Sequence, residues 1–178
     1  LARQADEFRR IIDPQKGDML FSLATFLDKF DISTVYPIIL FLLDARISET
    51  EWSKIATIIE SYLMRRAVCG LTGKGYNRIF LTMIRYLQQN GATAESVHKY
   101  LSELKGESTE WPSNASYNDA WQTRHAYQTL NNEKIVYILR RLNDLYSCNK
   151  TETIVIENPI TVEHLLPHHQ GNADPQVQ

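Results

Sequence analysis

The sequence predicts an all-α protein, a multi-helix bundle of seven to eight helices, with a short β appendage at the C-terminus. Three observations favour this class. Apolar residues recur every three to four positions through most of the first 150 residues, and capping residues and glycines separate these stretches. The β-branched run Thr153-Ile154-Val155-Ile156 appears after Cys148, where the composition shifts. We therefore divide the chain into a helical domain, residues 1–150, and a second segment, residues 151–178.

Three helices are predicted in the first 44 residues. The dipeptide Asp13-Pro14 ends the first, because the residue before a proline is biased away from helical geometry. Gly17 opens the second, which extends to Phe30 with apolar residues at helical spacing. The third begins near Thr34 and has Pro37 in its first turn, where a missing N–H costs little. Its run from 38 to 43 is apolar all round, so we expect it in the middle of the core.

Three further helices are predicted between residues 48 and 104. Ser48-Glu49-Thr50-Glu51 is a capping box, in which the hydroxyl and the carboxylate each satisfy a free N–H at the helix start. The helix that it opens extends to about Gly70. The next helix is expected to end at Gly91, and Thr93 to cap the one after it. The loop 71–75 is no Walker phosphate loop, because no Ser or Thr follows Lys74.

The rest of the helical domain is predicted as a long surface loop, a short helix and a final amphipathic helix. The loop, residues 105–118, is polar, and we expect Trp111 and Trp121 to pin it to the core. The short helix is placed at 118–128. The last helix, at about 132–147, has one apolar face that we expect to be buried, formed by Ile135, Ile138, Leu139, Leu142 and Leu145.

Composition limits the possible settings of the protein. Apolar residues make up 43% and charged residues 22% of the chain, values typical of a soluble globular protein. The net charge of -2 gives no overall attraction for nucleic acid, so a DNA contact would need a local basic patch. Cys69 and Cys148 lack metal-ligand spacing, which favours a cytoplasmic location. The longest apolar run is far shorter than the ~20 residues that cross a bilayer, so we expect no membrane insertion.

An acid and a histidine stand side by side in Ile160-Thr161-Val162-Glu163-His164-Leu165-Leu166-Pro167. A histidine can take a proton from water near neutral pH, and a carboxylate can hold a divalent metal ion. Adjacent residues on a regular strand face opposite sides, so the pair can serve one site only at a bend or a strand end. Taken alone, the pair also fits an ordinary surface strand.

An apolar strand that ends in acid-histidine-apolar-any-proline resembles the first motif of HNH (ββα-metal) endonucleases. More narrowly, the segment 162–167 after a long helical region resembles the GmrSD-like restriction and phage-defence family. Its members join an N-terminal ParB-like nucleotide-binding domain to a C-terminal HNH-type nuclease domain. A second stretch is similar to the helical segment that links those domains: Ser61-Tyr62-Leu63-Met64-Arg65-Arg66-Ala67-Val68-Cys69-Gly70, then Lys74-Gly75-Tyr76-Asn77-Arg78-Ile79-Phe80.

This resemblance implies a fragment of a modification-dependent restriction or phage-defence DNA endonuclease that hydrolyses phosphodiesters with metal assistance. It implies that His164 is the general base and that Glu163 binds Mg²⁺ or Mn²⁺ or orients the site. His168 is a further candidate for metal or phosphate contact. The implied partners are DNA and the parent protein's own N-terminal nucleotide-binding domain. The strand and helix that would complete the metal site do not follow Pro167, so we expect the isolated fragment to hold no metal and to be inactive.

Two readings stay open for Arg65 and Arg66, which point about 100° apart on a helix. In the first reading, one of the two arginines pairs inside the fold with an acid such as Glu60 or Asp44, and the second arginine is solvated. In the other, Arg65 or Arg66 joins a basic surface that contacts the DNA backbone or the neighbouring domain, together with Lys74, Arg78 and Arg85. For the chain as a whole, the alternative function is a non-catalytic helical interaction or DNA-binding module.

Overall fold

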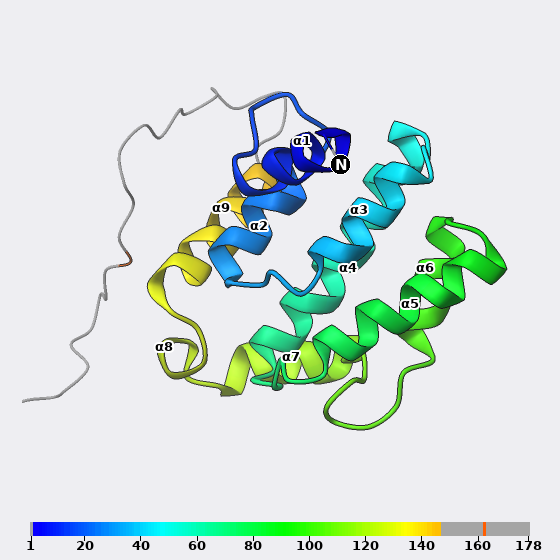
Figure 1. Cartoon of the computed structure of the whole chain (residues 1–178). Coiled ribbons are helices and arrows are strands. Elements are labelled where there is room, and N and C mark those ends of the chain that lie inside the picture. Colours follow the sequence, from blue (N-terminus) through cyan, green and yellow to red (C-terminus); the bar gives the residue numbers. More distant parts are fainter. Residues whose placement is uncertain (1, 147–161, 163–178) are drawn as a thin grey trace, which may run out of the picture.

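The computed structural model describes residues 2–146 and residue 162, and within them the protein is all-α (Figure 1). The predicted class is therefore confirmed for this part of the chain. Its helices are α1 (Ala2–Ile12), α2 (Phe21–Phe30), α3 (Tyr36–Asp44), α4 (Glu49–Val68), α5 (Tyr76–Asn90), α6 (Ala94–Ser102), α7 (Asn114–Thr123), α8 (Ala126–Thr129) and α9 (Asn132–Tyr146). The predicted β appendage lies outside the described residues, apart from Val162, which is half-buried.

The helix α4 is the centre of the fold, in contact with α2, α6, α7 and α8. Its apolar residues recur at helical spacing and lie on the buried side, at 0–1% exposure: Trp52, Ile55, Ile59, Tyr62 and Leu63. The helix ends as predicted, because Gly70 adopts φ +66 and the Leu71 N–H donates back to the Arg66 carbonyl at 2.9 Å.

The start of α4 differs from the predicted capping box in one half. Ser48 Oγ accepts a hydrogen bond from the Glu51 N–H at 3.2 Å, as expected. The Glu51 carboxylate, however, does not return to the start of its own helix; it accepts the Ala94 N–H at 2.5 Å, at the first residue of α6. A negative charge is favourable at that helix start. The prediction failed because a capping pattern cannot show that a second helix start lies within reach.

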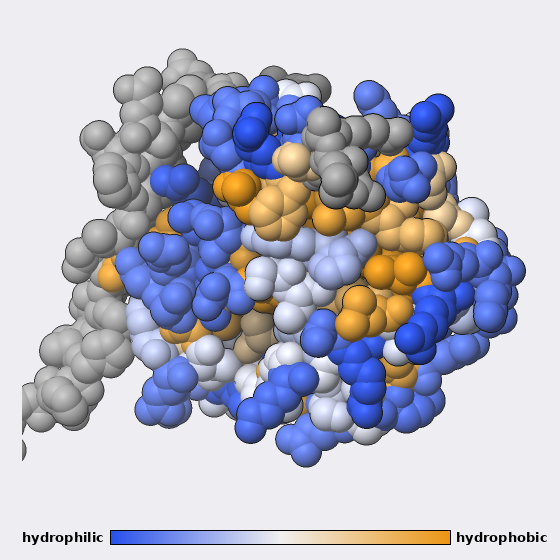
Figure 2. All heavy atoms as spheres, in the orientation of Figure 1, coloured by the Kyte–Doolittle hydropathy of each residue, from blue (hydrophilic) through white to orange (hydrophobic). Residues whose placement is uncertain are grey.

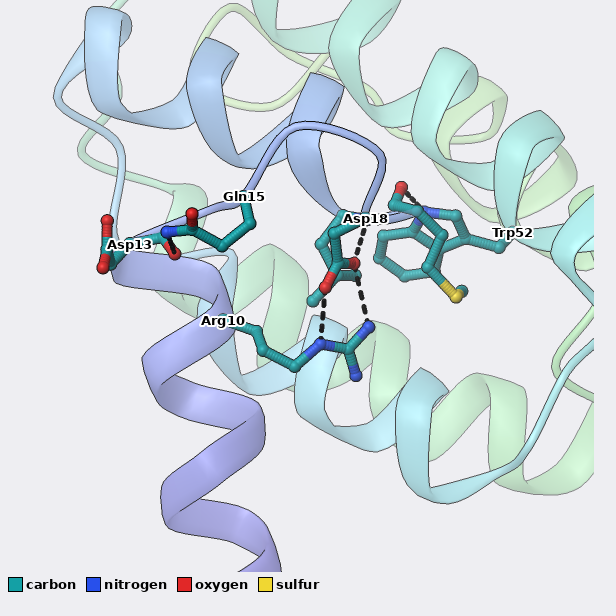
Figure 3. A network of polar contacts seen from close by, with 7 residues as sticks. Arg10, Asp13, Gln15, Asp18 and Trp52 are labelled. Atoms are coloured by element: carbon teal, nitrogen blue, oxygen red, sulfur yellow. Dashed lines mark hydrogen bonds and ion pairs between the residues drawn. The ribbon is translucent and has the colours of Figure 1, made fainter.

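The connection between α1 and α2 is held by a bidentate ion pair (Figure 3). Arg10 Nε and Nη2 donate to the two carboxylate oxygens of Asp18 at 2.7 and 2.8 Å. Asp18 Oδ1 also accepts the Leu20 N–H at 2.8 Å. In the same region the indole N–H of Trp52 donates to the Met19 carbonyl at 2.7 Å. These bonds fasten α1 and the start of α2 onto the central helix α4.

The apolar helix α3 does not lie in the middle of the core, and that prediction is wrong. Pro37 is in its first turn, as expected, and Ile38, Ile39 and Leu42 are buried. The other side of the helix, Leu40, Phe41 and Leu43, is only half-buried. Figure 2 shows hydrophobic side chains at the surface over α3, among largely hydrophilic neighbours. The all-apolar run therefore forms a helix that packs between α1 and α5 with one side near the surface, while the amphipathic α4 lies in the centre of the fold.

The segment 105–130 differs from the predicted loop and single short helix. Ser113 caps α7 through its Oγ, which accepts the Ser116 N–H at 3.1 Å, so the loop is shorter than expected. Arg124 and His125 adopt extended backbone and separate α7 from the single turn α8. Trp111 packs edge-on against Tyr62 with ring centroids 5.8 Å apart and pins the loop, as predicted. Trp121 is 42% exposed and does not pin the loop to the core, contrary to the prediction.

The last helix, α9, buries only the first part of its apolar face. Ile135 and Ile138 are buried, and the Tyr137 ring packs against Phe26 and Phe30 of α2. The predicted continuation of that face is exposed, namely Leu139, Leu142 and Leu145. A groove of about 270 Å³ separates Leu142 and Leu145 from Met64 of α4, where close packing was expected.

Candidate functional site

The residues predicted to carry chemistry, Glu163, His164 and His168, lie outside the described residues. Within residues 2–146 and 162, no group of three or more His, Cys, Asp and Glu side chains is placed to hold a metal ion. In the same part of the chain, no helix combines the length and the apolar character needed to cross a bilayer. The described site residues are therefore the basic ones.

Arg66 lies in the interior of the domain and is 0% exposed. Its Nη1 donates to the Glu110 carbonyl at 2.7 Å. Its Nη2 donates to three carbonyls, those of Thr72 at 2.8 Å, Ser108 at 3.1 Å and Glu107 at 3.2 Å. A nitrogen with two hydrogens thus shares them among three acceptors. The guanidinium ties the end of α4 to the loop 105–113.

Two tyrosine rings complete the surroundings of Arg66. The Arg66 Cζ lies 5.7 Å from the Tyr62 ring centroid and 5.6 Å from that of Tyr76, within the range of cation–π interaction. Tyr62 Oη also donates to the Thr109 carbonyl of the same loop at 2.7 Å. Burial raises the pKa of the Tyr62 and Tyr76 hydroxyls, while the positive charge of Arg66 acts in the opposite direction. Both hydroxyls therefore stay protonated at neutral pH.

This arrangement corrects the readings of Arg66 that the sequence left open. Arg66 forms no ion pair with Glu60, Asp44 or another described acid; main-chain carbonyls balance its charge. Because it is fully buried, it also cannot belong to a DNA-binding surface. Glu60 instead accepts from Tyr137 Oη at 3.0 Å and from Arg141 Nε at 3.3 Å, which links α4 to α9.

Arg65 is half-buried and lies against the start of α7. Its Nη1 donates to the Pro112 carbonyl and its Nε to Ser61 Oγ, each at 3.3 Å. Its Cζ lies 5.1 Å from the Tyr117 ring centroid. Arg65 therefore joins α4 to α7, and only part of its side chain meets solvent.

The remaining residues of the predicted basic surface are exposed. Lys74 precedes α5, and Arg78 and Arg85 are exposed on that helix. Arg78 and Arg85 are seven positions apart, so they share one face of α5. Leu81, which is 45% exposed, lies between them. The structure thus leaves Lys74, Arg78 and Arg85 exposed, whereas Arg66 is buried.

Sequence reasoning missed a second group of charged residues, which line a cleft of about 660 Å³. Its walls are the connection between α2 and α3, the turn after α4, the single turn α8 and the start of α9. We call it the polar cleft. Arg124 and Lys134 are its cations and Asp31 is its carboxylate. No local motif signals it, because its residues come from segments about a hundred positions apart.

Comparison with known protein families, with curated proteins and with solved structures finds no match for this chain.

Proposed function

We propose that this chain is the helical domain and the first catalytic motif of an HNH-type DNA endonuclease, of the modification-dependent restriction or phage-defence kind. The proposal rests on the resemblance of two separate stretches, 61–80 and 162–167, to one family. In the full-length protein, His164 is the general base that takes a proton from the attacking water. A positioned base is typically worth ~10²–10⁴ in rate.

One structural observation supports the proposal: the residues that carry the helical resemblance converge on a single buried cluster. Tyr62 and Arg66 come from its first part, and Gly75 and Tyr76 from its second. All four meet the loop 107–110 or the Arg66 guanidinium. A Cβ at Gly75 would lie 2.8 Å from the Ser108 carbonyl oxygen, so glycine allows the loop to approach. A resemblance in residues that depend on one another's packing is what a shared fold would produce.

The metal of this chemistry would be held by Glu163 together with residues of the full-length protein. Mg²⁺ or Mn²⁺ there would stabilise negative charge on the phosphate and the leaving oxygen. The described part of the chain would contact the phosphate backbone of the DNA through the side chains of Lys74, Arg78 and Arg85. Such contacts position DNA but carry no sequence information.

The experiment is a cleavage assay on the full-length protein, with plasmids that carry or lack modified bases, in Mg²⁺ or Mn²⁺ and with added nucleotide. Wild-type protein is expected to cut, and His164→Ala to cut at least about a hundredfold more slowly. His125→Ala is the matched control, since His125 is an exposed histidine before α8. Cleavage by His164→Ala at the wild-type rate would remove the nuclease assignment.

The second candidate is a non-catalytic helical interaction or DNA-binding module, which the exposed cations of α5 favour. It predicts salt-dependent DNA binding that Arg78→Ala and Arg85→Ala weaken together. Binding without cleavage, unaffected by His164→Ala, would select this candidate.

A further inference from the structure

The polar cleft has the size and the walls of a small-molecule site. Its volume of about 660 Å³ falls within the ~300–1,000 Å³ that is common for such sites. Residues from four separate segments line it, so a ligand bound there would bridge the ends of α2 and α4, the turn α8 and the start of α9. None of the residues proposed for DNA chemistry lines it.

Two cations face this cleft without an anionic partner among the described residues. The side chains of Arg124 and Lys134 form no ion pair or hydrogen bond there, although Lys134 Nζ lies 5.8 Å from the Phe30 ring centroid. Lys29, by contrast, pairs with Asp28 and Glu133 at 3.4 and 3.6 Å. Cations that line a concave surface focus their field into it and attract an anion.

The position of Arg124 depends on the absence of a side chain at residue 70. Gly70 has φ +66, a conformation that L residues rarely adopt. A Cβ there would lie 3.3 Å from Arg124 Cζ and would also meet its Nη1. The guanidinium therefore rests directly on the turn that ends α4, at the wall of the cleft.

One further group of the cleft suits the hydroxyls of a ligand, the carboxylate of Asp31 on the connection between α2 and α3. Asp31 is exposed and has φ +55, and its carboxylate oxygens accept hydrogen bonds. A carboxylate repels a ligand that is anionic throughout, but it binds one that also carries O–H groups.

We propose that the polar cleft binds a phosphate monoester of a polyhydroxylated small molecule, such as a sugar phosphate or a mononucleotide. The phosphate lies towards Arg124 and Lys134, and the ligand's hydroxyls lie towards Asp31. The buried Tyr76 ring, which also lines the cleft, offers an apolar surface to the sugar or base.

Calorimetry with the 178-residue chain tests this proposal, using ribose 5-phosphate, AMP, ribose and inorganic phosphate as probes. We expect both esters to bind and ribose to bind at least tenfold more weakly. Tighter binding of AMP than of ribose 5-phosphate identifies a nucleotide site, and equal affinity a sugar phosphate site. Arg124→Ala should weaken ester binding at least tenfold, because a charge-assisted hydrogen bond is lost.

Controls separate the site from general charge effects. Lys99→Ala removes an exposed cation of α6 and should leave binding unchanged. Asp31→Asn keeps a residue that tolerates positive φ and should weaken the esters but not inorganic phosphate. If Arg124→Ala unfolds the protein, Arg124→Lys and Lys134→Gln take its place, each compared at an unchanged melting temperature. Equal affinity for inorganic phosphate and both esters, or no effect of any cation variant, would overturn the proposal.

Discussion

At the scale of single residues, Arg66 explains how this domain carries a fully buried positive charge. A buried ion is expensive unless its hydrogen bonds are satisfied. Here four main-chain carbonyls accept hydrogen bonds from Nη1 and Nη2, and two aromatic rings flank the guanidinium, while Nε has no hydrogen-bond partner among the described residues. Removing the side chain would leave those carbonyls buried without a donor. A variant that lacks the guanidinium should therefore be less stable than the wild-type protein.

We expect Arg66→Ala to lower the free energy of unfolding by about 3 kcal/mol or more, in the range of broken buried polar networks. Arg66→Lys should restore part of this, because an ammonium donates but lacks the planar fork. Arg65→Ala is the control on the same helix and should cost less than about 1 kcal/mol. Urea denaturation of the three variants measures these differences. A loss for Arg66→Ala as small as that for Arg65→Ala would contradict the structural role.

Asp18 gives the domain a defined response to acid. The hydrogen bonds from Arg10 hold the pKa of the Asp18 carboxyl below its ordinary value, against the opposing effect of burial. Because the folded-state pKa is the lower one, the ion pair contributes fully above about pH 4 and is lost as the pH falls through the folded-state pKa. Arg10 is 42% exposed, so solvent screens the pair and its contribution is on the order of 1 kcal/mol.

Between pH 6 and pH 3, wild-type protein should therefore lose about 1 kcal/mol more stability than Asp18→Asn does. Urea midpoints at a series of pH values check this difference. Asp6→Asn is the matched control. The Asp6 side chain is 71% exposed, and its Oδ1 lies 3.7 Å from Arg9 Nη1, beyond hydrogen-bonding distance. Identical acid sensitivity of wild type and Asp18→Asn would show that this ion pair contributes nothing.

At the scale of elements, the sequence predicted best where a helix carries its own end signals. Ser48 and Gly70 mark the two ends of α4, Gly91 the end of α5 and Thr93 the start of α6, as expected. The predictions that failed concern features that depend on contacts with other elements. The extent of burial along α9, the partial burial of α3 and the hydrogen-bond partner of Glu51 are set by neighbours distant in sequence.

The candidate site divides in the same way. Exposure of Lys74, Arg78 and Arg85 could be inferred from the helical period of α5. The burial of Arg66 could not, because its acceptors lie about forty residues away in a loop with no regular pattern. The polar cleft was missed for the same reason. The assignments of Glu163, His164 and His168 remain predictions from the motif alone.

The two halves of α9 should respond differently to truncation of their side chains. Ile138 is 3% exposed, so Ile138→Ala should cost about 2–5 kcal/mol. Leu139 is 46% exposed and lies on the next position of the same helix, so Leu139→Ala should cost less than about 1 kcal/mol. Urea denaturation compares the pair. Equal losses would mean that the described burial of α9 does not hold in solution.

At the scale of the whole molecule, the described helices form one continuous hydrophobic core. Its buried apolar side chains extend from Ile11 in α1 to Ile138 in α9. The first and last helices are tied to the centre, since α2 packs on both α1 and α9 and also on α4. Residues 1–150 therefore contain every buried apolar side chain of the described part.

Residues 1–150 alone should accordingly fold as a cooperative unit, with the helical far-UV signal and tryptophan fluorescence lost at the same urea concentration. Trp52 is a suitable probe, because it is 1% exposed and donates to Met19 across the α2–α4 contact. A shorter chain, residues 1–130, is the matched control. It lacks Ile135, Ile138 and the Tyr137 ring that covers Phe26 and Phe30, so it should melt at lower urea or without a sharp transition. Broad, non-coincident transitions for residues 1–150 would mean that the core needs residues beyond 150, and that the boundary between the helical domain and the segment 151–178 has been placed wrongly.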